Sequence, residues 1–373
     1  MISKGCKVSI ITVVYNGAAT IEQTILSVLN QTYRNIEYIV IDGESTDGTQ
    51  RVIEKYKQRI TYYVSEKDDG LYDAMNKGIR RATGEIIGIL NSDDWYENNA
   101  VEKAVQYFAG HDAGILYGRL MLVYPDGSQR LEHLLPLETL WYQISVSHPT
   151  VFVKKCIYEK YGGFRTEYKI AADYELLLRL YCEHIDFGFI DSVLTYFRVG
   201  GISAQKGEQS YQESMEVSQK YIEKYSDRKE ELRNKLVNVR KADWFYLKIK
   251  TDKTLLPQLI YTYFQEEVAE IMIFGTGDWG TNCYELLKEE KVKIKLFIDN
   301  DMSKRGHFFH NIKIVTPQEL PGEKIFVLIA IKDRQEEIKE QLKELGKSSI
   351  RCAGLNDLMN AYYQKIKSMK GNR

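Results

Sequence analysis

The first 110 residues alternate short apolar runs with stretches in which apolar residues recur every three or four positions. Runs of apolar and β-branched residues predict four strands, at residues 8–14, 36–41, 62–65 and 85–90. Helical spacing predicts helices that begin near Thr20, Asp47 and Leu71. Strands that alternate with helices imply an α/β fold with a largely parallel, doubly wound sheet, whose ligands bind at the carboxyl ends of the strands.

The pattern changes after about residue 205. Residues 206–265 keep helical spacing and predict a helical connector. A second α/β unit follows, with strands predicted at 270–274, 293–298 and 326–331 and helices at 282–291 and 335–345. We therefore expect three parts, at residues 1–205, 206–265 and 266–373.

Composition narrows the class of protein. The 373 residues carry 51 basic and 52 acidic side chains, a net charge of -1, so we expect no nucleic acid partner. No run of about 18 apolar residues predicts a membrane span, and no small-residue cleavage site predicts a signal peptide. The five cysteines are scattered and form no CxxC pair, which predicts neither zinc nor a disulfide framework and fits a cytoplasmic protein.

Asp93 and Asp94 stand together where a predicted strand ends. Adjacent carboxylates repel each other unless a cation or hydrogen-bond donors occupy the site. A hard divalent cation with oxygen ligands would suit the pair and could bridge the phosphates of a nucleotide. The alternative is a helix N-cap followed by an acidic first turn.

Four segments of the chain share a pattern with one enzyme family: ITVVYNGAATIEQTILSVLNQTY, IVIDGESTDGT, DDGLYDAMNKGIRRATGEIIGILNSDD and AADYELLLRL. In this order they resemble family-2 glycosyltransferases, especially those that build O-antigen, capsule and related exopolysaccharides. The resemblance covers about residues 7–205. It implies a GT-A fold, a nucleoside-diphosphate sugar donor, a divalent metal (manganese or magnesium), a saccharide or lipid-linked glycan acceptor, and an inverting reaction.

The resemblance assigns several residues to the nucleotide. The end of the first strand matches the floor under the nucleotide, through Thr12, Val14 and Tyr15. Asp42 matches the carboxylate that contacts the base, and Gly43 stands where many members have a second Asp. Asp68 or Asp69 would border the donor pocket, or would cap the following helix.

The resemblance also assigns the metal ligand and the catalytic base. Asp94 matches the metal ligand, Asp93 would serve the ribose or the metal's water shell, and Asn91 replaces the first carboxylate of the family's DXD motif. Asp173 matches the base, although Ala172 stands where many relatives have Glu. Asp173 also opens a helical stretch, where the helix dipole alone would favour a carboxylate.

Weaker assignments surround these residues. Asn76 and Lys77 would face the diphosphate, or Lys77 would be a solvated surface residue. His148 would lie on an acceptor-side strand, or would be structural. Arg198 and residues 200–203 resemble a loop that closes over the donor phosphates, and a plain turn at the end of the domain is the alternative.

The second α/β unit carries its own motif. Gly275, Gly277 and Gly280 form GxGxxG between a predicted strand and helix, and Asp299 ends the next strand. This is a Rossmann context, in which backbone N–H groups hold a phosphate at the helix N-terminus. The remaining length predicts half of a dinucleotide-binding domain, similar to small Rossmann-like domains attached to sugar-modifying enzymes. A second nucleotide site and a purely structural role both stay open.

We therefore expect a glycosyltransferase domain, a helical connector and a small Rossmann-like domain. Two alternatives are a non-catalytic nucleotide-sugar-binding scaffold and an NAD-dependent sugar-modifying enzyme that uses the GxGxxG motif. Residues 228–253 hold nine basic and four acidic side chains around Trp244, Phe245 and Tyr246. This stretch predicts either peripheral contact with the inner face of the cell membrane or aromatic packing within the protein.

Overall fold

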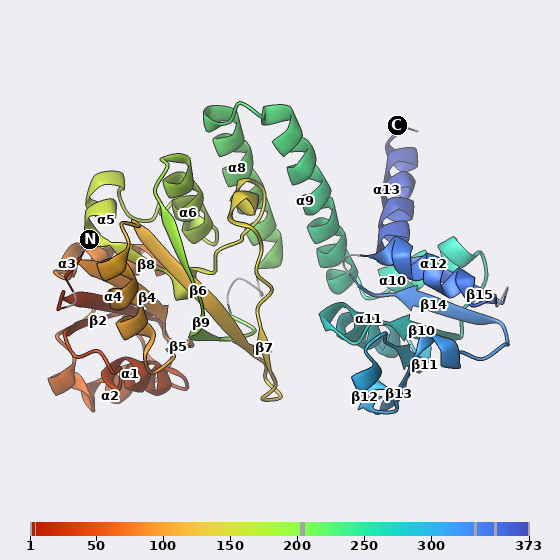
Figure 1. Ribbon diagram of the computed structural model, residues 1–373, viewed down its shortest axis with the longest axis horizontal. Coiled ribbons are helices and arrows are strands. Elements are labelled where there is room, and N and C mark those ends of the chain that lie inside the picture. The colour runs from red at the N-terminus through yellow and green to blue at the C-terminus, as the bar shows by residue number, and fades with distance from the viewer. Residues whose placement is uncertain (1, 4, 202–205, 332–333, 347–348, 372–373) are drawn as a thin grey trace. The chain divides into compact units, whose positions relative to one another are not determined.

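The computed structural model describes the chain except for residues 1, 4, 202–205, 332–333, 347–348 and 372–373, and it divides into two compact units (Figure 1). The first unit is Met1–Arg240 and the second is Lys241–Arg373. The division falls inside the stretch 206–265, within helix α9 (Lys229–Thr251). Each unit has its own sheet and its own hydrophobic core.

The first unit is built on a nine-stranded sheet with the order β3-β2-β1-β4-β8-β6-β9-β5 and β7 paired to β6. Four strands are parallel, as the alternation of elements predicts: β1 (Val8–Val14), β2 (Ile36–Asp42), β3 (Tyr62–Ser65) and β4 (Ile86–Asn91). The others are β5 (Trp95–Tyr96), β6 (Ile115–Val123), β7 (Gln129–Leu131), β8 (Phe152–Lys154) and β9 (Phe187–Arg198).

This second half of the sheet is mixed, which the prediction of a largely parallel sheet did not include. Strand β8 runs antiparallel to both β4 and β6, and β5 runs antiparallel to β9. Strands β6 and β9 are parallel, with β8 and two helices between them in the chain. The clean alternation of strand and helix holds only as far as β4, so the pattern that predicts parallel pairing stops there.

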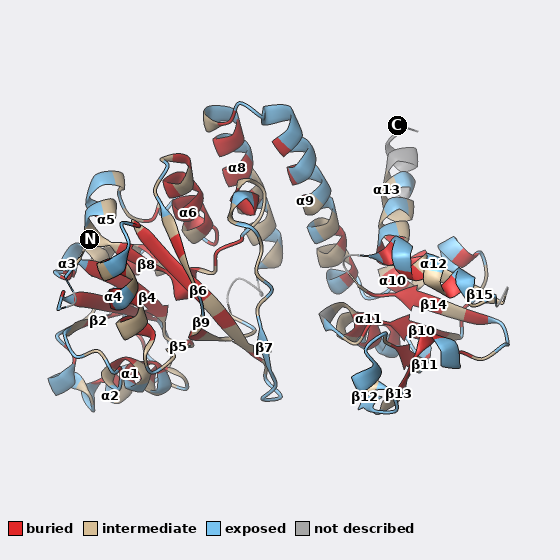
Figure 2. Ribbon diagram, in the orientation of Figure 1, coloured by how far each residue is buried: buried red, intermediate tan, exposed pale blue. Residues whose placement is uncertain are grey.

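Helices cover both faces of this sheet. They are α1 (Ile21–Leu29), α2 (Thr49–Glu54), α3 (Leu71–Arg81), α4 (Ala100–Gly110), α5 (Lys155–Tyr161), α6 (Ala172–Cys182) and α8 (Gly207–Tyr225). Alternate residues of β1 enter two different core clusters, Ile11 and Val13 in one and Ile10 and Val14 in the other. A strand covered on both faces is expected to be buried along its length, and every residue of β1 is buried. Figure 2 shows buried residues along part of β6 as well.

The second unit contains a six-stranded sheet with the order β12-β13-β11-β10-β14-β15. Its strands are β10 (Glu270–Phe274), β11 (Lys293–Ile298), β12 (Phe308–Phe309), β13 (Ile312–Val315), β14 (Ile325–Ile329) and β15 (Ile350–Gly354). Its helices are α10 (Leu255–Phe264), α11 (Asp278–Glu289), α12 (Gln335–Glu344) and α13 (Leu355–Gly371).

The prediction that only half of a dinucleotide-binding sheet is present is wrong. Strands β10, β11, β13, β14 and β15 pair in parallel with the spatial order 3-2-1-4-5 of a doubly wound sheet. The sequence pattern missed β13 and β15 because β13 has only four residues and β15 ends in Ala353 and Gly354. The fold is therefore a nearly complete Rossmann-like sheet.

Two of the three aromatic residues of α9 pack inside the second unit. Phe245 is buried with its ring 5.8 Å from that of Tyr362, and Tyr246 lies 4.3 Å from the ring of Trp279. Trp244 is half-buried. Several basic residues of 228–253 form ion pairs: Arg228 and Lys235 with Glu231, Arg233 with Glu223, and Lys253 with Glu289. Some of the side chains that predicted a membrane patch thus have partners within the protein.

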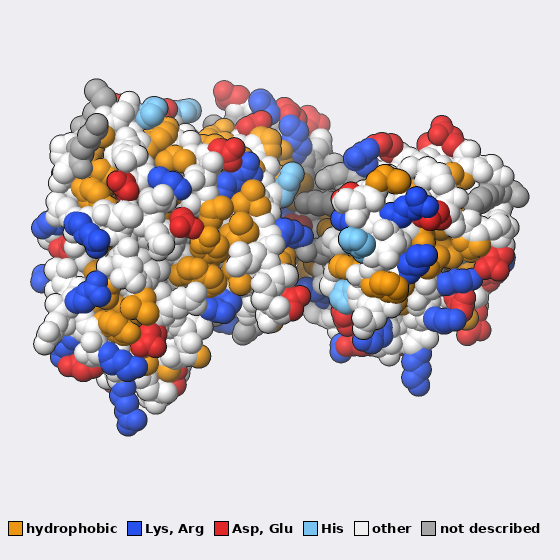
Figure 3. Space-filling view, turned by 60° about the horizontal axis from the view of Figure 1, so that its bottom comes forward, with side chains coloured by type: hydrophobic (Ala, Val, Ile, Leu, Met, Phe, Trp, Pro, Cys, Tyr) orange, Lys and Arg blue, Asp and Glu red, His pale blue; other side chains and the backbone are white. Residues whose placement is uncertain are grey.

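Two further observations concern the charges on the surface and the apolar character of the helices. On the face drawn in Figure 3, Lys and Arg side chains are interspersed with Asp and Glu on each unit. Among the residues that the structure describes, no helix combines the length and the apolar character needed to cross a bilayer.

Candidate active site

The carboxyl ends of β1, β2 and β4 bring the predicted site residues of the first unit together. In the parallel register Val14 lies opposite Asp42, and Val13 lies opposite Asn91. Tyr15, which follows β1, is 66% exposed, whereas Val14 is buried. The edge of the sheet at which ligands are expected therefore carries an exposed aromatic ring between two polar strand ends.

Asp42 is fully buried and has partners on both carboxylate oxygens. Its Oδ1 accepts a hydrogen bond from the hydroxyl of Ser45 and its Oδ2 one from the hydroxyl of Ser65, each at 2.5 Å. Thr12 is also fully buried, and its Oγ1 accepts from the hydroxyl of Tyr38 at 3.1 Å. Asp42 stabilises the loop that follows β2, and Thr12 links β1 to Tyr38 of β2. Tyr15 is the member of this group that reaches the surface.

Asp68 occupies the space in front of Gly43. A Cβ atom built on Gly43 would lie 2.5 Å from Asp68 Oδ2 and 3.5 Å from Tyr15 Cδ2. Asp68 is half-buried, and its Oδ1 accepts from the backbone N–H of Gly70 at 2.9 Å. A carboxylate thus lies where a side chain at position 43 would begin. In the sequence, the one indication of this space was Gly43, which stands where many family members have a second Asp.

Asp93 and Asp94 differ in their access to solvent. Asp94 is fully buried: its Oδ1 accepts from the backbone N–H of Arg198 at 3.2 Å, and its Oδ2 has no hydrogen-bond partner among the residues that the structure describes. Burial, and then the charge of Asp93, raise the pKa of Asp94 well above its ordinary value. Asp93 is half-buried, and burial raises its pKa also, although Arg198 opposes the shift.

These carboxylates fit a cation. The amide Oδ1 of Asn91 is, like Asp94 Oδ2, buried without a hydrogen-bond partner. Unpartnered buried oxygens are costly, and a bound cation would satisfy them. Among the described residues no group of three or more His, Cys, Asp or Glu side chains could hold a metal ion. A cation here would therefore take further oxygen ligands from phosphate or water.

Arg198 lies at the end of β9 beside this acidic pair. Its Nη2 donates to Oε1 of Gln23 at 2.9 Å, its guanidinium lies 5.3 Å from the ring centroid of Trp95, and its buried Nε has no partner. The following turn comes close to the acidic pair, because a Cβ on Gly201 would lie 3.5 Å from Asp93 Oδ2. Ile202 and Ser203, the rest of the predicted closing loop, lie outside the described residues.

Asp173, near the start of α6, has one occupied and one available oxygen. Its Oδ1 accepts from the backbone N–H of Tyr174 at 2.8 Å and from the hydroxyl of Tyr72 at 3.1 Å. Its Oδ2 accepts no hydrogen bond from any residue that the structure describes, and the side chain is half-buried. Tyr72 was not predicted, because a tyrosine on a helix 101 positions earlier gives no sequence signal of this contact.

His148 lies in a 3-10 turn (His148–Thr150), so the prediction that it lies on a strand is wrong. Pro149 removes one backbone N–H from this segment, and β8 begins only at Phe152. Burial lowers the pKa of His148, although the charge of Asp173 opposes the shift. The imidazole is therefore neutral at neutral pH, and its ring meets that of Phe164 edge to face at 5.4 Å.

The residues predicted near the diphosphate make contacts within the protein. The amide of Asn76 donates to the carbonyl O of Phe164 at 2.8 Å and accepts from its N–H at 2.9 Å. Lys77 forms an ion pair with Glu66 at 2.9 Å. Asp69 is exposed at the start of α3. Asn76 and Lys77 therefore stabilise the fold around α3.

In the glycine turn of the second unit, the backbone conformation requires glycine at Gly275 and close packing requires it at Gly280. Gly275 has φ +110°, and a Cβ on Gly280 would lie 2.0 Å from the carbonyl O of Gly275. A Cβ on Gly277 would meet nothing within 4 Å. Asp299 already accepts from the hydroxyl of Thr276 at 2.5 Å and from Lys304 Nζ at 2.9 Å. Burial alone would raise the pKa of Asp299, but these hydrogen bonds lower it.

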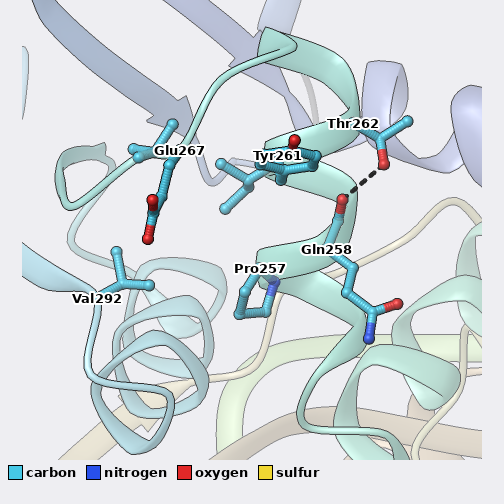
Figure 4. Close-up of a pocket in the computed structure, with 8 residues that line it drawn as sticks. Pro257, Gln258, Tyr261, Thr262, Glu267 and Val292 are labelled. Atoms are coloured by element: carbon cyan, nitrogen blue, oxygen red, sulfur yellow. Dashed lines mark hydrogen bonds between the residues drawn. The ribbon is translucent and has the colours of Figure 1, made fainter.

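A cavity of about 410 Å³ lies beside α10 in the second unit (Figure 4). It is lined by Pro257, Gln258, Ile260, Tyr261, Thr262, Glu267, Val268 and Val292. The hydroxyl of Thr262 donates to the carbonyl O of Gln258 at 2.8 Å, and Glu267 is the one charged side chain in the lining. None of the predicted site residues lines it, so we place the chemistry at the strand ends of the first unit.

Comparison with solved structures concerns the fold. The structure of Staphylococcus aureus TarS 1–349 in complex with UDP-GlcNAc has a TM-score of 0.53 at 19% identity, over 67% of this chain and 78% of that one. The mannosyltransferase PcManGT of Pyrobaculum calidifontis, in complex with GDP-Man and Mn²⁺, has a TM-score of 0.50 at 20% identity, over 62% of this chain and 69% of that one. At these identities the likeness shows a shared fold.

Comparison of sequences gives the family. Residues 9–168 match the model of glycosyl transferase family 2, and residues 267–352 match one described as C2185-like, N-terminal. An uncharacterized glycosyltransferase of Mycobacterium tuberculosis is 32% identical over 211 residues, which cover 53% of this chain and 78% of the relative. The putative teichuronic acid biosynthesis glycosyltransferase TuaG of Bacillus subtilis is 30% identical over 39% of this chain and 58% of its own length. With its first unit folded as in the GT-A structures, the chain belongs to glycosyltransferase family 2.

Proposed function

We propose that the chain is a metal-dependent, inverting glycosyltransferase that moves a sugar from a nucleoside-diphosphate sugar to a saccharide or lipid-linked glycan in surface polysaccharide synthesis. The observation that carries the proposal is the asymmetry of Asp173, whose Oδ1 is held by two donors while Oδ2 is left available. A carboxylate held in this way can accept a proton at a defined position, as a general base must.

In the proposed reaction the acceptor hydroxyl attacks the anomeric carbon on the side opposite the nucleotide. The new bond joins the acceptor oxygen to that carbon, and the bond from the carbon to the phosphate oxygen breaks. Asp173 Oδ2 takes the proton of the acceptor hydroxyl, and the electron pair leaves with the nucleoside diphosphate. Arg198, with an unpartnered buried Nε, is suited to contact that diphosphate.

We propose that the pair Asp93–Asp94 and Asn91 hold a divalent cation, manganese or magnesium. The cation would supply positive charge that favours departure of the diphosphate. Because the buried Oδ2 of Asp94 has no hydrogen-bond partner among the described residues, we assign the direct contact with the cation to Asp94. Asp93, the more accessible carboxylate, would serve the ribose or the metal's water shell.

For the nucleotide we propose that Tyr15 and Asp68 lie against the base. Tyr15 offers an exposed ring, and Asp68 Oδ2 points into the space in front of Gly43 beside it. Asp42 has both oxygens occupied by Ser45 and Ser65, so we give it the role of holding the loops that carry these residues. Asp69, exposed beside Asp68, stays a predicted neighbour of the donor.

The names of the relatives support the class of reaction. TuaG is named for teichuronic acid biosynthesis, TarS was solved with UDP-GlcNAc, and PcManGT with GDP-Man and Mn²⁺. The deciding experiment is a screen of UDP-glucose, UDP-galactose, UDP-GlcNAc and GDP-mannose for hydrolysis by the full chain with Mn²⁺. We expect one donor to be hydrolysed and chelator to stop the reaction. Hydrolysis of none of them would favour a non-catalytic nucleotide-sugar-binding scaffold.

For the second unit we propose a structural role in the enzyme, and not an NAD-dependent reaction. The carboxylate that would contact a ribose, Asp299, is already paired with Lys304 and Thr276. Gly277 is the one glycine of the motif with open space around it, so it marks the place where a bound nucleotide would have to be sought.

Peripheral contact with a membrane that carries the lipid-linked acceptor also stays a proposal. Phe245 and Tyr246 of α9 pack within the second unit, so the contact would depend on basic residues and on the half-buried Trp244. Flotation with anionic and neutral vesicles at low and high salt tests it. Failure to bind anionic vesicles at low salt would rule this stretch out as the contact.

A further inference from the structure

Tyr72, in the first turn of α3, is buried against the proposed base. Its side chain is 6% exposed and its ring stacks on Phe164 at 5.4 Å. Its hydroxyl lies 2.6 Å from the carbonyl O of Ile170 and 3.1 Å from Oδ1 of Asp173. The same hydroxyl therefore contacts the loop that leads into α6 and the carboxylate that the helix carries.

The hydroxyl has one proton, so these two acceptors compete for it. A charged carboxylate is a stronger acceptor than a neutral carbonyl. The proton therefore favours Asp173 while that carboxylate is ionised, and the carbonyl of Ile170 holds it once Asp173 has been protonated. Burial, and then the negative charge of Asp173, raise the pKa of Tyr72 well above its ordinary value, so the phenol stays a neutral donor.

We propose that Tyr72 is a positioning residue for the transfer reaction. Together with the backbone N–H of Tyr174, its hydroxyl fixes Oδ1 of Asp173 and thereby directs Oδ2 toward the acceptor hydroxyl. The inference rests on the proposed role of Asp173 as the base. It adds a residue from a different part of the chain, which sets both the orientation and the charge preference of that carboxylate.

The loop itself does not depend on Tyr72 alone. Oε2 of Glu213, on α8, accepts from the backbone N–H of Ile170 at 2.7 Å and from that of Ala171 at 3.0 Å. Loss of the Tyr72 hydroxyl therefore leaves the loop clamped, and the main consequence falls on the carboxylate. The other titratable groups near Asp173 and Tyr72 are His148, which burial keeps neutral, and Glu213, whose carboxylate is occupied by the loop.

The test is Tyr72→Phe in the full chain, which keeps the ring and its stacking and removes the hydroxyl. The assay is hydrolysis, with Mn²⁺, of whichever of UDP-glucose, UDP-galactose, UDP-GlcNAc and GDP-mannose the wild type turns over fastest. We expect kcat to fall about tenfold, with KM for the donor within about twofold, because the base is misdirected while donor contacts are kept. We also expect the acid limb of the pH profile to move to higher pH, since the charged carboxylate has lost a donor.

Two control variants separate this effect from loss of structure. Tyr33→Phe removes a tyrosine hydroxyl that donates to the carbonyl O of Cys6, and it should leave kcat and the pH profile unchanged. Glu213→Gln weakens the clamp on the loop, so it should lower the melting temperature. It should not move the acid limb to higher pH, because the loss of a nearby negative charge favours an ionised carboxylate. A Tyr72→Phe effect confined to melting temperature would assign the tyrosine a structural role and overturn the proposal.

The double variant Tyr72→Phe/Asp173→Asn distinguishes this inference from the proposed function beneath it. If Tyr72 acts through Asp173, the double variant should be no slower than Asp173→Asn alone. Wild-type kcat and pH profile in Tyr72→Phe, with Asp173→Asn inactive, would overturn the role of Tyr72 and leave the base in place. Full activity of Asp173→Asn, or hydrolysis of no donor by the wild type, would overturn the proposed function as well.

Discussion

The polar groups at the strand ends differ between the two units of this chain. In both units the carboxylate at the end of the second parallel strand has its partners: Asp42 accepts from Ser45 and Ser65, and Asp299 accepts from Thr276, from Lys304 and from the backbone N–H of Asp301. The first unit adds, at its strand ends, buried polar atoms that have no hydrogen-bond partner among the described residues: Asn91 Oδ1, Asp94 Oδ2 and, on β9, Arg198 Nε. These atoms of the first unit are available for a ligand to satisfy.

This difference shows that two units with similar parallel strands need not have the same function. Both units place loops at the carboxyl ends of parallel strands, where ligands of such sheets bind. An unpartnered buried polar atom is costly, and it persists where another molecule completes its hydrogen bonds or charge. The comparison therefore points to the first unit as the place of chemistry, although the second carries the more familiar glycine motif.

The largest effect should come from Asp173→Asn. This change keeps the shape of the side chain and removes its ability to take a proton, so turnover should fall at least about a hundredfold with little change in donor affinity. Kinetics of donor hydrolysis measure both quantities. Asp191→Asn, a surface carboxylate paired with Arg119, is the matched control and should keep wild-type turnover. Near wild-type turnover in Asp173→Asn would place the base elsewhere.

Removal of either carboxylate of the acidic pair should come next. We expect Asp94→Asn to raise the Mn²⁺ concentration needed for half-maximal activity at least about tenfold, because a direct ligand is lost. Asp93→Asn should weaken the response to Mn²⁺ by less, because Asp93 is placed in the metal's water shell. The measurement is a Mn²⁺ titration of activity for each variant. Full activity in excess chelator would contradict the metal site altogether.

A smaller effect should follow from filling the space in front of Gly43. In Gly43→Ala the new Cβ would lie 2.5 Å from Asp68 Oδ2 and would displace that carboxylate. We expect KM for the donor to rise about tenfold, as for a lost hydrogen bond to a charged group. In an Asp68→Ala background the same change should have no further effect, and Gly43→Asp should restore part of the affinity. Equal effects of Gly43→Ala in both backgrounds would show that Asp68 does not contact the donor.

The sequence predicted most of the fold because apolar periodicity is strong where both faces of a sheet are covered. The strand predicted at 8–14 agrees with β1 to the residue, and the helix predicted to begin near Thr20 begins at Ile21. Short strands such as β13 and β5 carry too few residues for a period to be read. They form because neighbouring strands offer hydrogen bonds to them, which is tertiary information.

For the candidate site too, the sequence predicted some residues and missed the contacts that depend on tertiary packing. Asp93 and Asp94 were recognisable because a motif coincides with the end of a strand, and Asp173 because its segment resembles the family; their roles stay predictions that the variants above test. The contacts of Tyr72 with Asp173 and of Asp68 with the space at Gly43 depend on how α3 packs against the sheet. Likewise, nothing in the sequence indicated that Asn76 would hold the backbone of Phe164.

The smallest effect should come from a substitution in the second unit. It tests whether the two units differ in ligand binding. Gly277→Val places a bulky side chain where a phosphate would approach the helix N-terminus, and nothing in the structure obstructs it. If the second unit is structural, the donor and Mn²⁺ should raise the melting temperature of this variant as much as that of the wild type, within about 1 °C. Asp94→Asn should reduce the same shift, because it acts at the first unit. A loss of part of the shift in Gly277→Val, or a shift produced in the wild type by NAD, would show instead that the glycine turn binds a nucleotide.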